Sequence, residues 1–194
     1  MARPREFDEA NTLHAVTQTF WKQGYQATSI KDLEKATGLT AGSLYKAYGS
    51  KRELFLLSLE RYMKEESYLA TLLKMFDTSL EQALRRIFDT IIESSSINSE
   101  RPSGCLVTNL AAELLNIDEI LGKEATHCLG DMQKALQFRL KWAQEREELD
   151  KKCDIDALSA YLMIVIQGLL VISTTTKDIG TMKHARDIAL ATLH

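Results

Sequence analysis

Hydrophobic side chains recur every three or four positions along most of this 194-residue chain, the spacing that places them on one face of an α-helix. No long stretch alternates polar and apolar residues as a half-buried strand would, and proline occurs only at Pro4 and Pro102. The pattern therefore predicts an all-α protein, with a break near Gly180 between its last two helices. The longer helices are expected at residues 7–23, 105–115, 118–147, 155–175 and 181–193, and the clearest loop at residues 94–104.

Further helix starts are indicated by capping boxes, in which a Ser or Thr and an acidic residue three positions later each bond the main-chain N–H of the other. This spacing occurs at Ser29–Asp32, Ser50–Glu53 and Thr78–Glu81. The helix after the second box is expected to pack on the preceding ones through Leu54, Leu57 and Tyr62. The helix after the third is expected to bury Leu80, Leu84, Ile87, Phe88 and Ile91.

The segment from Thr28 to Lys51 has the pattern of two short helices joined by a tight turn. Gly38 would end the first helix, because glycine readily adopts the left-handed backbone found at helix ends. Thr40 can cap the second helix through its hydroxyl. Because Leu44 and Tyr48 are four residues apart, they share one face of this second helix and are expected to be buried.

The opposite face of that second helix carries side chains that are small, hydroxylated, aromatic or cationic, and none is acidic. They are Thr40, Ala41, Gly42, Ser43, Tyr45 and Lys46. An acidic side chain on a DNA-binding surface would face phosphates, whereas small and hydroxylated side chains can approach base edges in a major groove. The segment therefore predicts a helix-turn-helix whose second helix reads DNA.

The stretch GYQATSIKDLEKATGLTAGSLYKAYGSKRELF resembles the DNA-binding signature of the tetracycline-repressor (TetR) family of one-component bacterial regulators. The shared features are an aromatic residue after Gly24, a Thr/Ser pair, a Gly-Leu turn, a Leu-Tyr-x-x-aromatic helix and a Ser-Lys pair. The resemblance is dense from Phe20 to Leu56 and is architectural beyond that. Two positions depart from the pattern: Glu34, expected on the solvated side, stands where the family usually has Ala, and Ala41 where it often has a basic or polar residue.

The resemblance implies a three-helix helix-turn-helix DNA-binding domain at residues 1–52 (the head) and a larger helical effector-binding and dimerisation domain at residues 53–194 (the body). Phosphate and backbone contacts are implied for Thr28, Ser29, Tyr45, Lys46 and Lys51, and base-edge contacts for Thr40, Ala41, Gly42 and Ser43. Tyr48 belongs to the same motif and is expected to be a core residue with its hydroxyl at the surface. Arg3 and Arg5 either reach a minor groove as an arm or stay solvated.

For the body, the resemblance implies a homodimer through the helices at 155–175 and 181–193, and a cavity for a small-molecule effector. The helix from Ile155 is apolar nearly all round and so needs covering on several sides, by a partner molecule or, alternatively, as the central helix of a monomer. The candidate cavity residues are aromatic or polar side chains in apolar helical surroundings, and the alternative for each is ordinary packing or a bond to a neighbouring helix. They are Phe88, Cys105, Asn109, Glu113, His127, Trp142, Tyr161 and Gln167.

Cys105 has a second possible role. It follows Pro102-Ser-Gly104 and is expected to start a helix, where free main-chain amides favour a thiolate. It is therefore a candidate sensor of electrophiles or oxidants, and the alternative is a small apolar residue that packs at the helix start. The resemblance favours a repressor that binds a palindromic operator in double-stranded DNA, and activation stays open.

Charge and composition agree with these expectations. The net charge is −3 overall, but residues 1–52 carry +3 and the remainder −6, which fits a DNA-binding head on a different kind of domain. Three cysteines without a C-x-x-C pair, and four histidines without metal-binding spacing, predict no metal site and no cofactor. The absence of a glycine-rich phosphate loop or a G-x-S-x-G elbow argues against an enzyme.

Two further alternatives concern partners and location. A helical adaptor that uses the helix-turn-helix for protein contact would leave four outward residues unexplained, namely Ser43, Tyr45, Lys46 and Lys51, and its binding would be insensitive to salt. No basic leader with an apolar stretch opens the chain, so we expect no signal peptide. The most apolar run, 157–172, is shorter than the roughly 20 residues that a membrane span needs, so we expect a cytoplasmic protein without a membrane partner.

Overall fold

The structure is a computed structural model that describes residues 8–96, 101–115 and 117–194, and all regular secondary structure in these ranges is helical. The expected arm at Arg3 and Arg5, and the first residues of the expected helix at 7–23, lie outside the described residues. In chain order the elements are α1 (Glu9–Gln23), α2 (Ile30–Thr37), α3 (Ala41–Tyr48), α4 (Lys51–Arg61), the π-helix η1 (Tyr62–Glu66), α5 (Tyr68–Lys74), α6 (Leu80–Ser94), α7 (Leu106–Leu114), α8 (Glu119–Glu145), α9 (Ile155–Thr174) and α10 (Ile179–Ala191).

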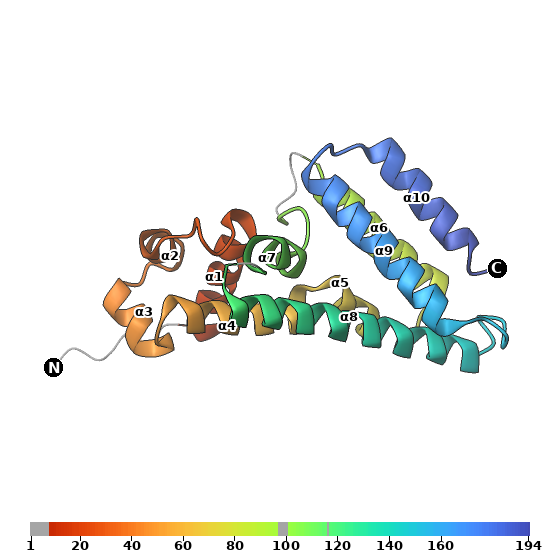
Figure 1. The fold of residues 1–194 in the computed structure, drawn as a ribbon, viewed down its shortest axis with the longest axis horizontal. Helices are drawn as coiled ribbons and strands as arrows, with labels where there is room; N and C mark the ends of the chain where they lie inside the picture. The colour runs from red at the N-terminus through yellow and green to blue at the C-terminus, as the bar shows by residue number, and fades with distance from the viewer. Residues whose placement is uncertain (1–7, 97–100, 116) are drawn as a thin grey trace.

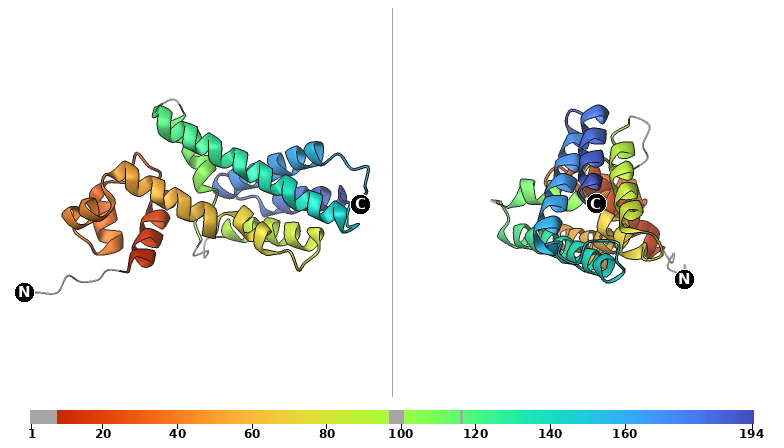
Figure 2. Two further views of the ribbon diagram at one scale, coloured as in Figure 1. Left: turned by 90° about the horizontal axis from the view of Figure 1, so that it is seen from below. Right: turned by 90° about the vertical axis from the view of Figure 1, so that its right-hand side faces the viewer.

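The head and the body lie at opposite ends of an elongated molecule (Figure 1). Helices α1 to α4 form one end, α6, α9 and α10 lie together at the other, and α8 runs along the body beneath them. At 27 residues, α8 is about 40 Å long at 1.5 Å per residue. Figure 2 shows that α4 continues directly from the head into the body. Helix α7 packs on α8 and also contacts α1, so it lies at the junction between head and body.

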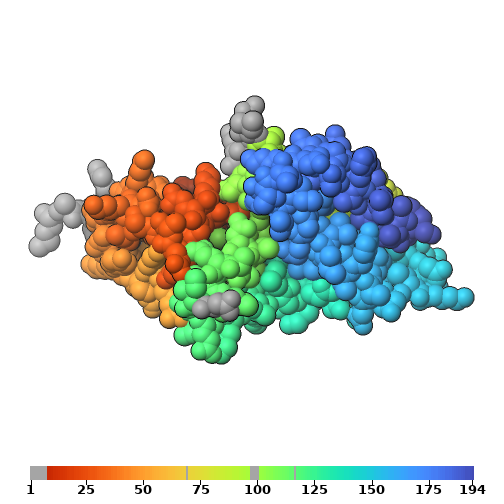
Figure 3. Space-filling view, turned by 45° about the horizontal axis from the view of Figure 1, so that its top comes forward, coloured from red at the N-terminus to blue at the C-terminus, as the bar shows by residue number. Residues whose placement is uncertain are grey.

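One continuous set of buried apolar side chains extends from the head into the body. It includes Phe20 of α1 in the head and Phe55 of α4 just beyond it, whose rings meet edge to face with centroids 4.9 Å apart. The proposed boundary at residue 52 falls in the first turn of α4, and the buried residues of this helix pack on α1. The space-filling view in Figure 3 shows the head in contact with the body along this junction. A change of head orientation therefore has to disturb buried contacts.

The helix ends that define the head were predicted correctly. Ser29 and Asp32 form a capping box at the start of α2, and Ser50 and Glu53 form another at the start of α4. Gly38 ends α2 in the left-handed conformation, with φ at 71°. A side-chain hydrogen bond from Ser29 lowers the pKa of Asp32, and a main-chain hydrogen bond from Ser50 lowers the pKa of Glu53, as expected for carboxylates held in capping boxes.

Several predicted details in the body were wrong. Ser79, one residue after the predicted cap, caps α6 by accepting from the N–H of Gln82, because the hydroxyl of Thr78 donates instead to the carbonyl of Met75. Leu57 is 38% exposed because the buried face of α4 is formed by the neighbouring positions. Gly180 lies inside α10, whose cap is Asp178, so the break between the last two helices falls earlier than predicted.

Helix α9 is longer than the apolar run at 157–172 suggested. It has 20 residues and, by length and composition only, could cross a membrane, so the prediction that this segment is too short was wrong. Only 33% of its most apolar 18-residue window is buried within the described chain. Its exposed apolar side chains include Tyr161, Ile164 and Val171, so much of the apolar surface of this helix is uncovered in the described chain.

Candidate nucleic-acid interface

Helix α3 presents the predicted polar face to the outside of the head. Its buried side carries Leu44 and Tyr48, at 0% and 7% exposure, as the four-residue spacing predicted. Thr40 caps the helix by accepting from the N–H of Ser43, and the two hydroxyl oxygens are 3.0 Å apart. The residues left facing outward are Thr40, Gly42, Ser43, Tyr45 and Lys46, which are exposed, and Ala41, which is half-buried.

The start of α3 is fastened to α2 by a carboxylate. The Glu34 Oε1 atom accepts a hydrogen bond from the main-chain N–H of Ala41 at 2.6 Å. Glu34 is half-buried, so the expectation that it points to the solvated side was wrong. The two departures from the family pattern are therefore partners: the acidic side chain at position 34 satisfies a free amide in the first turn of the recognition helix.

Two of the expected DNA contacts do not lie at the surface. Thr28 is 1% exposed, and its hydroxyl donates to the carbonyl of Gly24 at 2.6 Å, because this bond closes the turn before α2. The hydroxyl of Tyr48 is buried as well, and burial raises the pKa of Tyr48. In contrast, Ser29 is exposed at the start of α2, where its hydroxyl bonds Asp32.

Lys51 lies at the first residue of α4, directly after the Ser50 cap. Its ammonium nitrogen is 4.5 Å from the centre of the Tyr25 ring, so the side chain is held by a cation–π contact. Partial burial lowers the pKa of Lys51, and the carboxylate of Glu113 opposes this shift. The charge is thus fixed beside the turn that connects α1 to α2, close to the start of α2.

The same turn is bonded to the body by Glu113 of α7. Its two carboxylate oxygens accept from the main-chain N–H groups of Tyr25 and Gln26, at 3.0 and 2.6 Å. Gly24 allows this approach, because a Cβ atom there would lie 2.8 Å from the carboxylate. Glu113 was predicted to line the effector cavity, but its carboxylate instead holds the head. A salt bridge of 3.1 Å between Arg52 and Asp118 adds a second link between head and body.

A small apolar cavity lies inside the body, with a volume of about 30 Å³. The residues that line it are Tyr68, Leu72, Ile87, Cys105, Met132, Leu136, Met163, Ile166, Gln167 and Leu170. Two of the eight candidate effector residues are among them, Cys105 and Gln167. The side-chain oxygen of Gln167 accepts from the hydroxyl of Thr108 at 2.5 Å.

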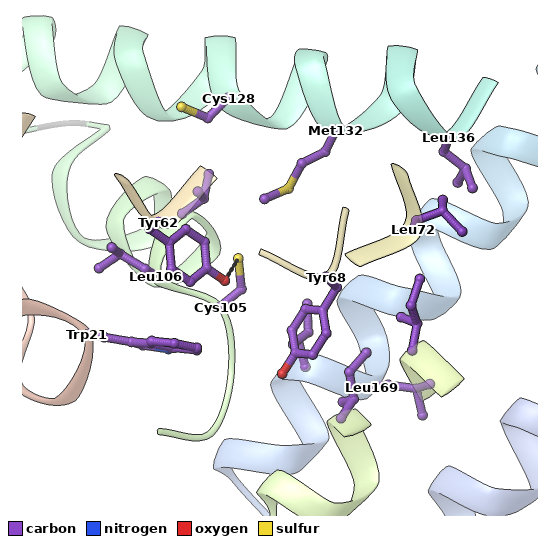
Figure 4. Close-up of a cluster of buried hydrophobic side chains, with 14 of the residues drawn as sticks. Trp21, Tyr62, Tyr68, Leu72, Cys105, Leu106, Cys128, Met132, Leu136 and Leu169 are labelled. Atoms are coloured by element: carbon purple, nitrogen blue, oxygen red, sulfur yellow. Dashed lines mark hydrogen bonds between the residues drawn. The ribbon is translucent and has the colours of Figure 1, made fainter. Parts of the chain in front are cut away.

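Cys105 is the N-cap residue of α7, so the predicted helix start is confirmed. Its side chain is 1% exposed, and the Tyr62 hydroxyl donates to its Sγ atom at 3.2 Å (Figure 4). The cavity-lining Tyr68 was missed because the short helix α5 was not predicted. Met132 and Met163 were not singled out, because methionines at helical spacing are usually ordinary core residues.

The other candidates for the cavity lie elsewhere. Phe88 is fully buried in the core, and Trp142 packs against the ring of Phe76 with centroids 5.5 Å apart. His127 is exposed and pairs with Asp131 at 3.1 Å, because both lie on the outer face of α8. The two remaining candidates are exposed: Asn109 lines a shallow hollow beside Trp21, and Tyr161 belongs to the outer face of α9.

Comparison with known proteins covers both parts of the chain. Residues 13–57 match the family described as "Bacterial regulatory proteins, tetR family". Residues 81–189 match "Tetracyclin repressor-like, C-terminal domain". The first match contains the capped helices α2 and α3, and the second contains helix α9, most of α10 and the cavity-lining residues other than Tyr68 and Leu72.

Individual relatives are similar over nearly the whole chain. The HTH-type transcriptional regulator YezE of Bacillus subtilis (strain 168) is 30% identical over 196 aligned positions, which cover 100% of both chains. The HTH-type transcriptional repressor ComR of Escherichia coli (strain K12) is also 30% identical, with 98% of this chain and 90% of ComR covered. Among solved structures, a cysteine mutant of the TetR family transcriptional regulator CifR, complexed with 26-bp double-strand operator DNA, has a TM-score of 0.84 at 22% identity and covers 100% of both chains.

Proposed function

The chain belongs to the TetR family of DNA-binding transcriptional regulators and is not an enzyme, and we propose that it is a repressor that binds a palindromic operator as a homodimer. In this proposal a small-molecule effector, or modification of Cys105, releases it from DNA. The observation that carries the proposal is the outward face of α3, which offers hydroxyl, aromatic and cationic side chains and no carboxylate.

The residues of this face divide into two groups by chemistry. Lys46, Tyr45 and Lys51, together with the exposed start of α2 at Ser29, would hold the phosphate backbone. Thr40, Ala41, Gly42 and Ser43 would lie against base edges, where small side chains permit close approach. Since the Ala41 amide is already bonded to Glu34, base reading falls mainly to the hydroxyls of Thr40 and Ser43.

The exposed apolar surface of α9 and α10 supports the homodimer. Ile164 is 72% exposed and Ile188 is 64% exposed, which is costly for large apolar side chains in water. On α9, Tyr161, Ile164 and Val171 recur at three- and seven-residue steps, as expected for a helix that packs against another helix. Pairing of α9 and α10 with their copies in a second chain would cover this surface and place two heads side by side.

The enclosed cavity in the body supports a response to a small molecule. A ligand that binds better when the heads are badly spaced for the operator weakens DNA binding, and DNA weakens ligand binding equally. Cys105 lines the cavity and accepts a hydrogen bond from Tyr62. Both a reversibly bound effector and a covalent modification would therefore act at this residue. Repression agrees with the similarity to ComR, which is a transcriptional repressor, and we place the protein in the cytoplasm.

The proposal is tested by selecting bound sequences from random duplex DNA with the purified full-length protein. We expect enrichment of a two-fold-symmetric site whose affinity falls steeply with salt. The matched control is a Lys141→Ala variant, which removes an exposed cation from α8 in the body and should select the same site equally well. Selection of no site, with weak binding that salt abolishes, would contradict the proposal and favour the adaptor alternative.

A further inference from the structure

The guanidinium of Arg101, in the segment before α7, lies between two aromatic rings. Its central carbon is 4.9 Å from the ring centre of Trp21 and 4.6 Å from that of Tyr68. Both rings are buried, at 3% and 6% exposure. Its Nη2 atom also donates to the main-chain carbonyl of Glu66 at 2.5 Å. A planar cation enclosed in this way is held by ring faces and by a hydrogen bond at the same time.

The two rings belong to different parts of the molecule. Trp21 is in α1 of the head, whereas Tyr68 is the first residue of α5 and lines the cavity in the body. Figure 4 shows Trp21 and Tyr68 on opposite sides of Cys105. Arg101 is therefore a direct bridge between the cavity wall and the head, formed by a residue that belongs to neither of the helices it joins.

The π-helix η1 supports this bridge from the other side. Tyr62, at its start, meets the Trp21 ring edge to face with centroids 4.9 Å apart. Glu66, at its end, accepts from Gln18 of α1 at 2.7 Å through its carboxylate, while its carbonyl receives Arg101. π-helices are rare and occur mostly at functional positions. Here η1 connects α4, which begins at the end of the head, to α5 of the cavity wall.

Because the cavity is small, a ligand that fills it has to disturb the contacts that Arg101 makes. A volume of about 30 Å³ is well below the roughly 150 Å³ of a cavity that binds benzene, so an organic effector of that size or larger has to displace lining side chains. Tyr68 is the one aromatic residue among those that line the cavity in the described structure. Displacement of its ring removes one of the two faces that enclose Arg101, and Arg101 in turn contacts Trp21 of the head.

We propose that Arg101 is the positioning residue that couples the cavity to the head: the stack of Trp21, Arg101 and Tyr68 fixes the orientation of the head for operator binding, and an effector releases it by displacing Tyr68. This inference rests on the proposed function, since it deepens the account of how that site is regulated. Without the stack the head has no fixed orientation in the free protein, and DNA binding has to restore that orientation. Loss of the stack therefore weakens operator binding, although no DNA-contacting side chain has changed. We expect a roughly tenfold loss, within the usual range of allosteric coupling.

The test uses the full-length variants Arg101→Met, Tyr68→Leu and the double variant, all in a Trp142→Phe background. That background leaves Trp21 as the single tryptophan, because the chain has two. Operator affinity is measured over a range of salt concentrations, and the fluorescence of Trp21 is recorded without DNA. The control is Arg86→Met, which removes an exposed arginine from α6.

Each single variant is expected to lose roughly tenfold in operator affinity, and the double variant no more than either, because both changes break one stack. The salt slope and the affinity for non-specific DNA stay as in the parent, which separates positioning from phosphate contact. Tyr68→Leu also shifts the emission of Trp21, because the rings of Tyr68 and Trp21 contact the same guanidinium. The control variant changes none of these quantities.

Additive losses in the double variant, unchanged operator affinity in folded single variants, or an altered salt slope would each overturn the proposal. If Arg101→Met fails to fold, Arg101→Lys replaces it, because lysine keeps the charge and loses the planar guanidinium. If the parent protein selects no operator, the proposed function fails, and the emission of Trp21 in Tyr68→Leu still tests the coupling: an unchanged emission then contradicts it.

Discussion

The carboxylate of Glu34 in α2 accepts a hydrogen bond of 2.6 Å from the main-chain N–H of Ala41, the first residue of α3. This bond links the two helices of the helix-turn-helix across the Gly38 turn. It satisfies one of the free amides that every helix start presents, and it places a negative charge at the positive end of the α3 dipole. The orientation of the recognition helix therefore depends on a side chain outside that helix.

Replacement of Glu34 by Ala should destabilise the head by about 1–2 kcal/mol, since a hydrogen bond to a charged group is lost. Binding to non-specific DNA should become tighter, because a negative charge near the phosphates is removed, so the ratio of specific to non-specific affinity falls. Urea unfolding and binding titrations measure both effects. Glu34→Gln keeps an acceptor for the Ala41 amide and should retain more of the stability; equal losses in the two variants would argue against the hydrogen bond.

Lys51 and Ser43 should differ in the kind of binding that their loss impairs. Lys51→Ala removes a cation held beside Tyr25, and should weaken binding to all sequences alike by about tenfold and reduce the salt slope by about one. Ser43→Ala removes an exposed hydroxyl from α3, and should change the preference among sequences at nearly constant salt slope. Titrations with a panel of duplexes at several salt concentrations separate the two. A Lys51 effect confined to one sequence would contradict this division.

Loss of the Glu113 carboxylate should loosen the turn between α1 and α2. In Glu113→Ala the main-chain N–H groups of Tyr25 and Gln26 lose their acceptor, and their hydrogen exchange should accelerate by at least about tenfold. Exchange measured by NMR or mass spectrometry tests this directly. Exposed Glu93 on α6 supplies the control, since Glu93→Ala should leave exchange in the turn unchanged. Unchanged exchange in Glu113→Ala would mean that these hydrogen bonds do not hold the head.

Cys128 should be nearly inert towards thiol reagents. Burial, assisted by the nearby carboxylates of Glu124 and Asp131, raises the pKa of Cys128 to about 12. At pH 8 its thiolate fraction is then about 10⁻⁴, roughly a thousandfold below that of an ordinary cysteine. Alkylation by iodoacetamide at pH 8, followed by mass spectrometry, should therefore modify the half-buried Cys153 long before Cys128, and the rate at Cys128 should keep rising with pH up to about 12. Equal rates at pH 8 would contradict the assignment.

The homodimer should depend on the apolar face of α9. Ile164→Asp places a charge on the most exposed large apolar position of that helix, and desolvation of the charge in an interface should shift the protein to monomers at micromolar concentration. Sedimentation velocity measures the shift. Ile120→Asp, at an exposed apolar position at the start of α8, should remain dimeric. A monomeric wild type would contradict the dimer itself.

Local signals in the sequence were sufficient to predict the head. Ser29 with Asp32, and Ser50 with Glu53, identify helix starts through bonds between residues three apart, and Leu44 with Tyr48 identify a buried face through spacing alone. Each of these pairs lies within about one helical turn, so it can be recognised from the sequence. The exposed face of α3 follows from them, and so the candidate interface could be predicted almost in full.

The failures involve contacts between distant segments. Glu113 and Tyr25 are 88 positions apart, and the sequence gives no sign that a carboxylate of α7 reaches that turn. Arg101 likewise meets Trp21 and Tyr68 only through tertiary packing. The family resemblance implied a phosphate contact for Thr28, but its hydroxyl bonds the Gly24 carbonyl instead. The sequence alone therefore could not distinguish polar residues of the body that line the cavity from those that join the head to the body.

The central claim, a dimeric reader of a symmetric site, is tested most directly by one pair of titrations. Affinity is measured for the selected duplex and for the same duplex with one half-site scrambled, at equal salt. We expect two protomers on the intact site, and a loss of at least about a hundredfold in affinity when one half-site is scrambled, since several base contacts are removed at once. Equal affinity for the two duplexes would contradict it.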